Sequence, residues 1–397
     1  MVLTRRARPE DVEEIINLAN LVFRPRSSGL TPSMGLQYPF FLSAQNAENL
    51  FVAEDGGRIV AHNGIMKNTV QINGHKISMA SMGAVCTHPD YRGQGIATQL
   101  LLEVLSALRY EGIALLTISG DRGLYMRNGA DYTSLKKTFV LTRDSGKAEA
   151  VKSQCELPET LAIVYHQKTI ATIADEMAEL YQEEPVRYSR PKWQFPTLIK
   201  AAPGVNDVPY PPYMAAGTLW IGGCLTAYVL GYVKESKFQV MEYAGERLAV
   251  GRLLHQLLTD LEVDKVTVDV PAHDCQLTAY LEACGHRGEP KPYPFTFVVT
   301  NAETLWNQVQ PVIQERIRIS GLKARLKAGL DDSLGEPSDQ QANDDLARSQ
   351  GKPPVDMEDG KALLHFLFDV ENRMKYGEPW DSVLPLPLPW PGGLNYI

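Results

Sequence analysis

A glycine-containing turn that joins an apolar strand to an amphipathic helix is the feature that most constrains this chain. The turn follows Val85, and its residues Gly93, Gly95 and Ala97 have little or no side chain. Backbone N–H groups in such a turn approach an anion closely, and the helix dipole adds positive potential. We therefore predict a pyrophosphate-binding turn. Its expected contacts are Arg92, Gly93, Gln94, Gly95, Ile96, Ala97 and Thr98.

The residues after the turn have the periodicity of a helix followed by a strand. Apolar residues repeat at helical spacing over residues 100–108, and Gly112 ends this helix. Residues 113–118 form an apolar run that predicts a strand, and a short helix follows that stops near Gly129. The local order of strand, turn, helix, strand and helix indicates an α/β fold.

Two better-known phosphate-binding loops fit the turn poorly. The P-loop requires a Lys-Ser/Thr pair directly after its last glycine, where this chain has Ile96 and Ala97. The dinucleotide-binding pattern G-x-G-x-x-G fits Gly93 and Gly95, but Thr98 stands in place of the third glycine and no acidic residue ends the next strand. The sequence therefore favours neither a P-loop nor a dinucleotide-binding fold.

The pattern Arg-x-x-Gly-x-Ala, formed by Arg92, Gly95 and Ala97, resembles the GNAT superfamily of acetyl-CoA-dependent N-acyltransferases. The resemblance includes the preceding sequence Val-x-x-His-Pro-x-Tyr-Arg-Gly. Residues 5–16 look like the family's first strand and helix, and residues 125–129 look like its last helix. The resemblance implies a GNAT acyltransferase fold with a mixed sheet, acetyl-CoA (coenzyme A) as the cofactor and no metal.

The composition is that of a globular protein of two or three domains. The 397 residues include 44% hydrophobic and 22% charged residues, and no apolar run reaches the length of a membrane span. The start of the chain lacks a signal-peptide core, so we expect a cytoplasmic protein. The five scattered cysteines form no C-x-x-C pair, which argues against a zinc site or a disulfide framework. No basic run interleaves with aromatic residues, so nucleic-acid binding is not expected.

Charge is distributed unevenly along the chain, whose net charge is −8. Residues 1–147 contain 16 Lys and Arg against 13 Asp and Glu, and the remainder contains 23 against 34. A basic region suits a polyphosphate cofactor. Acidic walls would concentrate a cationic amine, although solvated acidic faces are also common.

A second module follows the first and has a similar order of predicted helices and strands. A polar break at residues 143–147 ends the first module, and a strand, a helix, a strand and a short helix are predicted over residues 238–285. Glu246 stands where the phosphate would bind, and Leu281 corresponds to Tyr125, so this degenerate GNAT-like copy is expected to bind anions poorly. The predicted domains are residues 1–147, 148–300 and 301–397.

The smaller C-terminal domain begins with a predicted helix over residues 302–319. A polar, loop-rich stretch at 331–359 and an apolar helix at 360–371 follow. The Pro-rich end, residues 380–397, favours a packed extended tail over a ligand for an SH3-type domain. Two GNAT-like modules before a C-terminal domain resemble the enhanced intracellular survival (Eis) group of GNAT proteins, which ends in a sterol-carrier-like domain.

The resemblance also implies roles for residues of the first module and of the tail. Tyr125 is expected beside the thioester sulfur as the general acid, with a packing tyrosine as the alternative. In the Eis group the terminal carboxylate enters the active site, so Ile397 is a catalytic candidate, with a tail packed elsewhere as the alternative. Cys86 is interpreted as a buried structural residue. The cofactor contacts expected outside the turn are Met82, Gly83, Ala84, Val85 and Ser119.

An aromatic segment after the first helix is the candidate for acceptor binding. Its residues Phe23, Tyr38, Phe40 and Phe41 suit a broad amine pocket and, equally well, an apolar core. We predict an N-acetyltransferase that transfers acetyl from acetyl-CoA to a primary amine by direct attack in a ternary complex. A small cationic or aminoglycoside-like amine is the favoured acceptor, and a homo-oligomer is expected. The alternatives are a protein lysine or N-terminus as the acceptor, and a non-catalytic acyl-CoA- or lipid-binding module.

Overall fold

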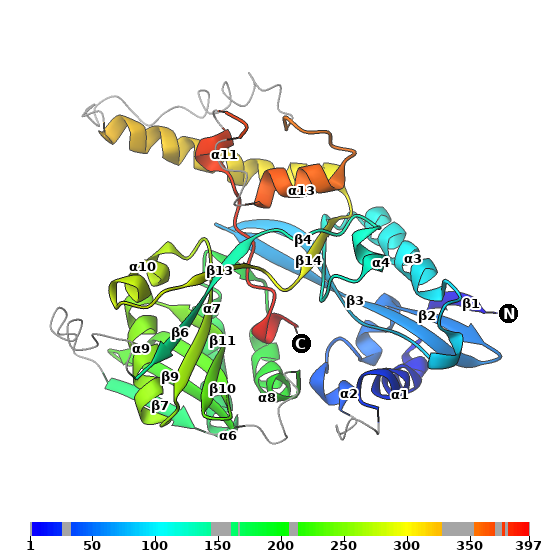
Figure 1. Cartoon of the computed structure of the whole chain (residues 1–397), viewed down its shortest axis with the longest axis horizontal. Helices are drawn as coiled ribbons and strands as arrows, with labels where there is room; N and C mark the ends of the chain where they lie inside the picture. Colours follow the sequence, from blue (N-terminus) through cyan, green and yellow to red (C-terminus); the bar gives the residue numbers. More distant parts are fainter. Residues whose placement is uncertain are drawn as a thin grey trace.

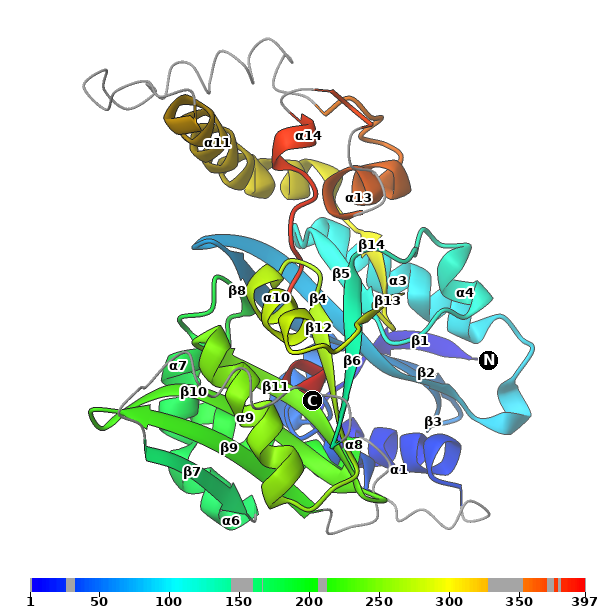
Figure 2. The ribbon, with the colours of Figure 1, turned by 60° about the vertical axis from the view of Figure 1, so that its left-hand side comes forward.

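The computed structural model describes residues 2–25, 33–143, 160–165, 167–205, 213–327, 353–369, 375–377 and 380–396. Two mixed β-sheets lie side by side, and helices of the C-terminal region pack against the first sheet (Figure 1). The view in Figure 2 separates the two sheets and shows the C-terminal end of the chain between them. The two-sheet α/β architecture confirms the predicted fold class.

The first sheet has the strand order β1-β2-β3-β4-β5-β14, and β8 pairs with β3. Only β4 and β5 are parallel neighbours. Helices α1 (Val12–Phe23) and α3 (Ile96–Tyr110) cover opposite faces of this sheet, because successive residues of β2 point to opposite sides and join different cores. The strands are β1 (Leu3–Arg6), β2 (Leu50–Asp55), β3 (Arg58–Ile72), β4 (His75–Thr87), β5 (Leu115–Ile118), β8 (Val186–Tyr188) and β14 (Thr296–Val299).

The predicted order around the turn is present in the first sheet. Strand β4, helix α3, strand β5 and helix α4 (Gly123–Met126) follow one another in the expected order. The apolar stripe of α3 includes Leu100, Leu101, Val104 and Leu108, all of which are buried. A short helix, α2 (Met34–Gln37), lies in the aromatic segment between α1 and β2.

The second sheet has the strand order β13-β6-β12-β11-β10-β9-β7. Its only parallel pair is β11 and β12. Helix α9 (Arg247–Asp260) packs on one face, and α7 (Ala174–Tyr181) and α8 (Phe195–Val205) pack on the other. The strands are β6 (Leu135–Thr142), β7 (Thr160–Tyr165), β9 (Tyr213–Ile221), β10 (Cys224–Lys234), β11 (Lys237–Gly245), β12 (Lys265–Pro271) and β13 (Glu289–Pro292).

The second module repeats the element order of the first. Strand β11, helix α9, strand β12 and helix α10 (Cys275–Ala283) correspond to β4, α3, β5 and α4. The two sheets also exchange strands. β6 follows the first module in the chain but pairs with β12 and β13, and β14 follows the second module but pairs with β5. Since β6 precedes residue 147 and β14 follows it, the exchange links the two sheets across the predicted domain boundary. The boundary itself stays a prediction.

The regular secondary structure in the described part of the C-terminal region is helical. It contains α11 (Ala302–Lys327), α13 (Gly360–Phe368) and α14 (Trp380–Val383), and no strand occurs in the described residues after 301. These helices share a core with β3, β4 and the segment that carries β14. Most of the predicted polar stretch at 331–359 lies outside the described residues. A sterol-carrier-like domain is not confirmed, and no helix of the described chain is long and apolar enough to cross a bilayer.

Candidate functional site

Strands β4 and β5 pair over only four residues and then part. The last pair is Met82 with Ile118, after which β4 continues to Thr87 whereas β5 ends. The opening contains a cavity of about 130 Å³. The residues that line it are Phe23, Arg24, Met34, Tyr38, Met82, Gly83, Ala84, Val85, Ile118, Ser119, Arg122 and Tyr125. We call this space the split-strand cavity.

A β-bulge shapes the wall that β4 contributes to the split-strand cavity. The register between β3 and β4 shifts between His62 and Gly64, and Ala84 has a φ of 51°. A bulge leaves the extra residue without its ladder partner, so a main-chain group there is available to a ligand. The buried ring of His62 donates from Nδ1 to the Ala84 carbonyl oxygen at 3.0 Å, which holds the bulge in place.

Burial lowers the pKa of His62 to about 4, although its hydrogen bond to Ala84 opposes the shift. The ring is therefore neutral at physiological pH and acts as a hydrogen-bond donor rather than a charge. Burial also raises the pKa of the Cys86 thiol to about 12, so this thiol stays protonated and is a poor nucleophile. The chemistry of this wall therefore depends on the main chain of β4.

The glycine turn lies at the N-terminal end of α3. Gly93 and Gly95 have φ values of 76° and 79°, and a Cβ added at either would meet no atom within 4 Å. Gly95 is the N-cap of α3, and no side chain caps this helix. The first N–H groups of a helix have no partner within the helix. The turn thus offers exposed N–H groups and open space, which suits a phosphate group.

The second module has filled the equivalent position with its own carboxylate. The Glu246 side chain caps α9 and accepts from the N–H groups of Leu248 at 2.9 Å and Ala249 at 2.6 Å. Strands β11 and β12 also part, but Arg247 at this opening is paired with Glu184 and Asp274. In the second module, the Glu246 carboxylate therefore occupies the position that a phosphate would take, as the sequence predicted.

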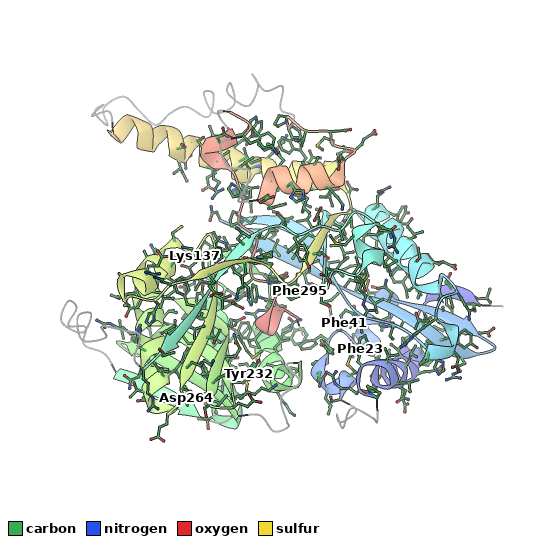
Figure 3. All side chains as sticks on the ribbon, in the orientation of Figure 1. Phe23, Phe41, Lys137, Tyr232, Asp264 and Phe295 are labelled. Atoms are coloured by element: carbon green, nitrogen blue, oxygen red, sulfur yellow. The ribbon has the colours of Figure 1, made fainter. Side chains whose placement is uncertain are left out.

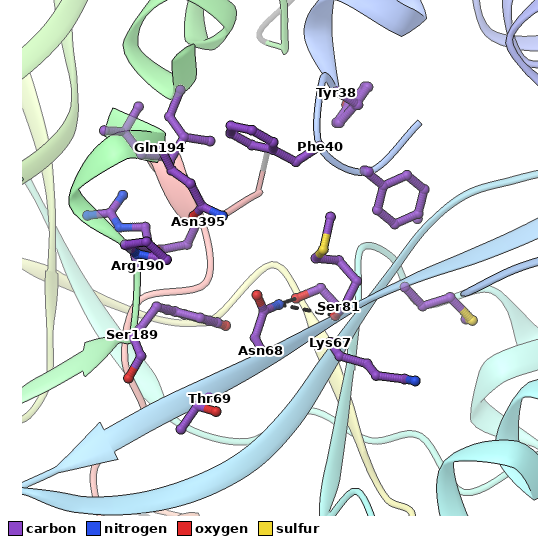
Figure 4. Close-up of a pocket in the computed structure, with 18 of the residues that line it drawn as sticks. Tyr38, Phe40, Lys67, Asn68, Thr69, Ser81, Ser189, Arg190, Gln194 and Asn395 are labelled. Atoms are coloured by element: carbon purple, nitrogen blue, oxygen red, sulfur yellow. Dashed lines mark hydrogen bonds between the residues drawn. The ribbon is translucent and has the colours of Figure 1, made fainter. Parts of the chain in front are cut away.

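A larger cavity of about 450 Å³ lies between the two modules (Figure 4). The first module contributes Tyr38, Phe40, Phe41, Met66, Lys67, Asn68, Thr69, Ser81, Met82, Gly83 and Ala84 among others. The second module contributes Tyr188, Ser189, Arg190, Gln194 and Leu198, and the tail contributes Leu394 and Asn395. We call this space the inter-module cavity.

The two cavities share part of their lining. Tyr38, Met82, Gly83 and Ala84 line both of them, so the bulged segment of β4 stands between the two spaces. Figure 3 shows Phe23 and Phe41 on the side of the first module that faces the second. Two ligands, one bound in each cavity, would therefore meet at the bulge of β4.

Buried and partly buried polar groups surround the inter-module cavity. Asn68 donates from Nδ2 to Ser81 Oγ at 3.1 Å and to the Met66 carbonyl at 3.2 Å (Figure 4). The Tyr188 hydroxyl is buried and has no hydrogen-bond partner of good geometry among the described residues. Arg190 pairs with Glu242 at 2.8 Å, and its guanidinium carbon lies 3.7 Å from the ring centroid of Tyr181.

The residues predicted from the sequence fall into three groups in the structure. Residues 92–95 form the turn and residues 96–98 begin α3, while Met82 to Val85, Ser119 and Tyr125 line the split-strand cavity together. Tyr38, Phe40 and Phe41 line the inter-module cavity, whereas Phe23 lines only the split-strand cavity. Ile397 lies outside the described residues, but Leu394 and Asn395 just before it line the inter-module cavity.

Several polar residues of the site were not predicted. They are His62, Asn68, Ser81, Tyr188 and Arg190. Each stands in an ordinary strand or loop sequence, and only contacts between segments distant in the chain bring them together. The isolated buried histidine in an apolar strand was the one signal available. No group of three His, Cys, Asp or Glu side chains that could hold a metal occurs in the described part of the chain.

Comparison with known proteins places the first module in a family. Residues 4–133 match the family model described as an acetyltransferase (GNAT) domain. This stretch is similar to GNAT acetyltransferase domains. The chain is also 31% identical over 80 residues to the uncharacterized N-acetyltransferase YhbS of Escherichia coli K12. That alignment covers 20% of this chain and 47% of YhbS, so the chain spans about half the length of the curated relatives it matches.

Solved structures share the fold over most of the chain at low sequence identity. A probable N-acyltransferase of unknown function from Enterococcus faecalis V583 has a TM-score of 0.60 at 14% identity, covering 78% of this chain and 75% of that chain. Eis1 from Mycobacterium abscessus has a TM-score of 0.56 at 14% identity, covering 78% of this chain and 76% of that chain. The likeness extends well beyond the GNAT domain and includes the second module.

The neutral, buried state of His62 predicts a pH dependence of stability. The unfolded chain binds a proton at this histidine below about pH 6.5, whereas the folded chain binds it only near pH 4. The free energy of unfolding should therefore fall as the pH drops from 7 to 4, and His62 should account for roughly 2 to 3 kcal/mol of that loss. Urea unfolding of wild type and His62→Asn at both pH values measures this contribution.

In His62→Asn the amide nitrogen takes the place of Nδ1 but does not titrate. The variant should keep the contact with Ala84 and lose this part of the pH dependence. Other groups, including the buried His273 with its similarly low pKa, contribute equally to both proteins. An identical loss of stability in both proteins would show that His62 is not responsible.

Proposed function

We propose that this chain is an acetyl-CoA-dependent N-acetyltransferase that acts on a primary amine by direct attack in a ternary complex. The observation that carries the proposal is the meeting of two cavities at the bulge of β4. The split-strand cavity suits the cofactor and the inter-module cavity suits the acceptor. The GNAT domain at residues 4–133 supports the same activity.

The chain's residues fit a pyrophosphate and a thioester. Residues 92–98 would bind the pyrophosphate, because the N–H groups of this turn have no side-chain cap and a Cβ at Gly95 would project into open space. Main-chain groups of Met82 to Val85 would contact the acyl carbonyl and the pantetheine arm, with Ser119 on the facing side of the cavity. Acetyl-CoA, when bound, supplies an acetyl group that is activated as a thioester.

Tyr125 is the proposed general acid. Its side chain is buried and lines the split-strand cavity with Ser119 and Val85. Proton transfer from a phenol to a thiolate is uphill by roughly 2 kcal/mol at ordinary pKa values. A hydrogen bond from the Tyr125 hydroxyl to the leaving sulfur therefore contributes alongside full proton transfer.

The carboxylate of Ile397 is the proposed base. Leu394 and Asn395 line the inter-module cavity, so the last two residues begin at the wall of the proposed acceptor site. Asn395 is fixed there, because its side chain accepts a hydrogen bond from Tyr181 and donates one to the Trp390 carbonyl. A carboxylate at this place would take the proton that the attacking amine loses.

Other parts of the sequence-based prediction stay proposals. Tyr38, Phe40 and Phe41 are proposed acceptor contacts, and Phe23 is proposed to contact the ligand from the split-strand cavity. The domain limits at residues 147 and 300, the cytoplasmic location, the homo-oligomer and the sterol-carrier-like character of residues 301–397 are predictions too. A non-catalytic acyl-CoA- or lipid-binding module is the competing function, and it would bind acetyl-CoA without releasing thiol in the presence of amines.

Replacing Gly95 with alanine should weaken acetyl-CoA binding at least about tenfold, because the added Cβ occupies the space needed by a phosphate. The positive φ of Gly95 also makes the variant less stable by roughly 1 kcal/mol. Gly57→Ala is the matched control, since Gly57 has a φ of 81° and open space in the turn between β2 and β3. Titration calorimetry should show normal acetyl-CoA affinity for the control. Equal affinities in the two variants would refute the proposed binding of pyrophosphate by the turn at residues 92–98.

Replacing Tyr125 with phenylalanine should lower kcat by roughly tenfold to a hundredfold with little change in the KM for acetyl-CoA, because the acid is lost and the packing is kept. Tyr110→Phe is the control, since Tyr110 is exposed at the end of α3. Release of free thiol over a panel of amines provides the measurement. A Tyr125→Phe enzyme as fast as the control would remove Tyr125 from the mechanism.

Deleting residues 396–397 should lower kcat by at least about tenfold, because the terminal carboxylate moves two residues back along the tail. Ile397→Ala keeps the carboxylate in place and should retain near-normal kcat. Thermal unfolding of both proteins separates a catalytic loss from a folding defect. Full activity in the folded deletion variant would count against the tail as the base.

A further inference from the structure

The charged residues that line the inter-module cavity are both cations. They are Lys67 and Arg190, and the described lining contains neither aspartate nor glutamate. The carboxylates that pair with these two cations, Glu111 and Glu242, are not among the lining residues. Figure 4 shows the Lys67 side chain directed away from Asn68 and Gln194. The described walls therefore offer an entering ammonium group no counter-charge.

The apolar part of the lining combines aromatic rings with methionines and with the aliphatic residues Ile113, Leu198 and Leu394. Tyr38, Phe40 and Phe41 come from one segment, and the methionines Met66 and Met82 lie on the adjoining strands. The rings of Phe40 and the exposed Trp193 pack edge to face with their centroids 5.4 Å apart. Such walls bind planar apolar groups through area and ring geometry.

One buried hydroxyl in the cavity, that of Tyr188, has only a weak contact with the Ser81 side chain. The Tyr188 hydroxyl is buried, lines the cavity and lacks a hydrogen bond of good geometry within the described residues. Burial raises its pKa well above the ordinary value, so the hydroxyl remains protonated and able to donate. An unpaired buried donor is costly, and a ligand oxygen would satisfy it.

The charged lining, the apolar lining and the Tyr188 hydroxyl together favour some amines over others as acceptors. The attacking amine must be neutral when it reacts, so a single amine needs no permanent counter-ion in the cavity. The proposed Ile397 carboxylate would be engaged by the reacting amine. Every further ammonium group would therefore have to leave water without a second carboxylate among the described lining residues to replace its hydration. A polycation is therefore disfavoured, and an acceptor with one amine and a flat apolar body is favoured.

We propose that the acceptor is an aromatic primary monoamine that carries an oxygen for the Tyr188 hydroxyl, and that polyamines and aminoglycosides are poor substrates. This inference rests on the proposed acetyltransferase function and sharpens its acceptor. It differs from the cationic acceptor that the acidic composition of residues 148–397 favoured.

The full-length protein is tested with acetyl-CoA and five acceptors, and thiol release is followed. Tyramine is the oxygen-bearing aromatic monoamine, phenethylamine is its counterpart without the oxygen, and spermidine, kanamycin and a lysine peptide are the competitors. We expect kcat/KM for tyramine to exceed that for spermidine and kanamycin at least about tenfold, and that for phenethylamine about threefold or more. Faster acetylation of any competitor overturns the inference while the acetyltransferase function stands. Binding of acetyl-CoA without thiol release from any amine overturns the function and the inference together.

Two variants test the physical basis of the choice. Gln194→Glu adds a carboxylate to the lining and should raise kcat/KM for spermidine about fivefold, with little change for phenethylamine. Gln194→Met is the matched neutral control and should not favour spermidine. Tyr188→Phe should lower kcat/KM for tyramine more than kcat/KM for phenethylamine and so remove the preference for tyramine. An unaltered spermidine rate in the folded Gln194→Glu protein, or an unaltered tyramine preference in Tyr188→Phe, would contradict the corresponding contact.

Discussion

The parting of β4 and β5 beyond Met82 and Ile118 is the constraint on which the rest of the site depends. In a continuously paired sheet, the main-chain groups of both strands would bond to each other and to no ligand. The parting opens the split-strand cavity, and the bulge at Ala84 turns the wall of β4 toward both cavities. His62 supports that bulge from the core as a neutral donor, so the geometry does not depend on a buried charge.

The second module shows what becomes of the same framework without a ligand. Its strands β11 and β12 part after three pairs, and its helix α9 begins at the equivalent place. Glu246 has taken the anion position, and the tail residues Trp390 and Asn395 line the small cavity at the opening. The module instead supplies one wall of the inter-module cavity through Tyr188, Arg190 and Gln194. The second module thus has a capped helix where the first has an open turn, and it contributes a wall of the inter-module cavity.

Local patterns in the sequence predicted the first module well. The glycine turn, the stripe of α3 and the short helix after β5 depend on neighbours within a few residues, so periodicity and turn chemistry suffice. The capping role of Glu246 was also predictable from its position before a helix. The exchange of β6 and β14 was not, because β6 pairs with a strand more than a hundred residues away and no local signal specifies that partner. The cluster of Asn68, Ser81 and Tyr188 depends on the same distant contacts.

The net charge of a segment says little about the lining of the inter-module cavity, and the reason is physical. The surplus of acidic residues after residue 147 suggested walls that attract cations, but the described lining of the cavity contains no aspartate or glutamate, and several acidic side chains of the second module are bound in local pairs. Glu242 pairs with Arg190, and Glu184 and Asp274 pair with Arg247. A paired carboxylate contributes little field beyond its partner, and exposed charges farther away are screened by salt within about 10 Å. In the proposed acceptor site, the groups on the cavity wall itself would therefore select the amine, and on this wall they include aromatic rings and neutral polar side chains.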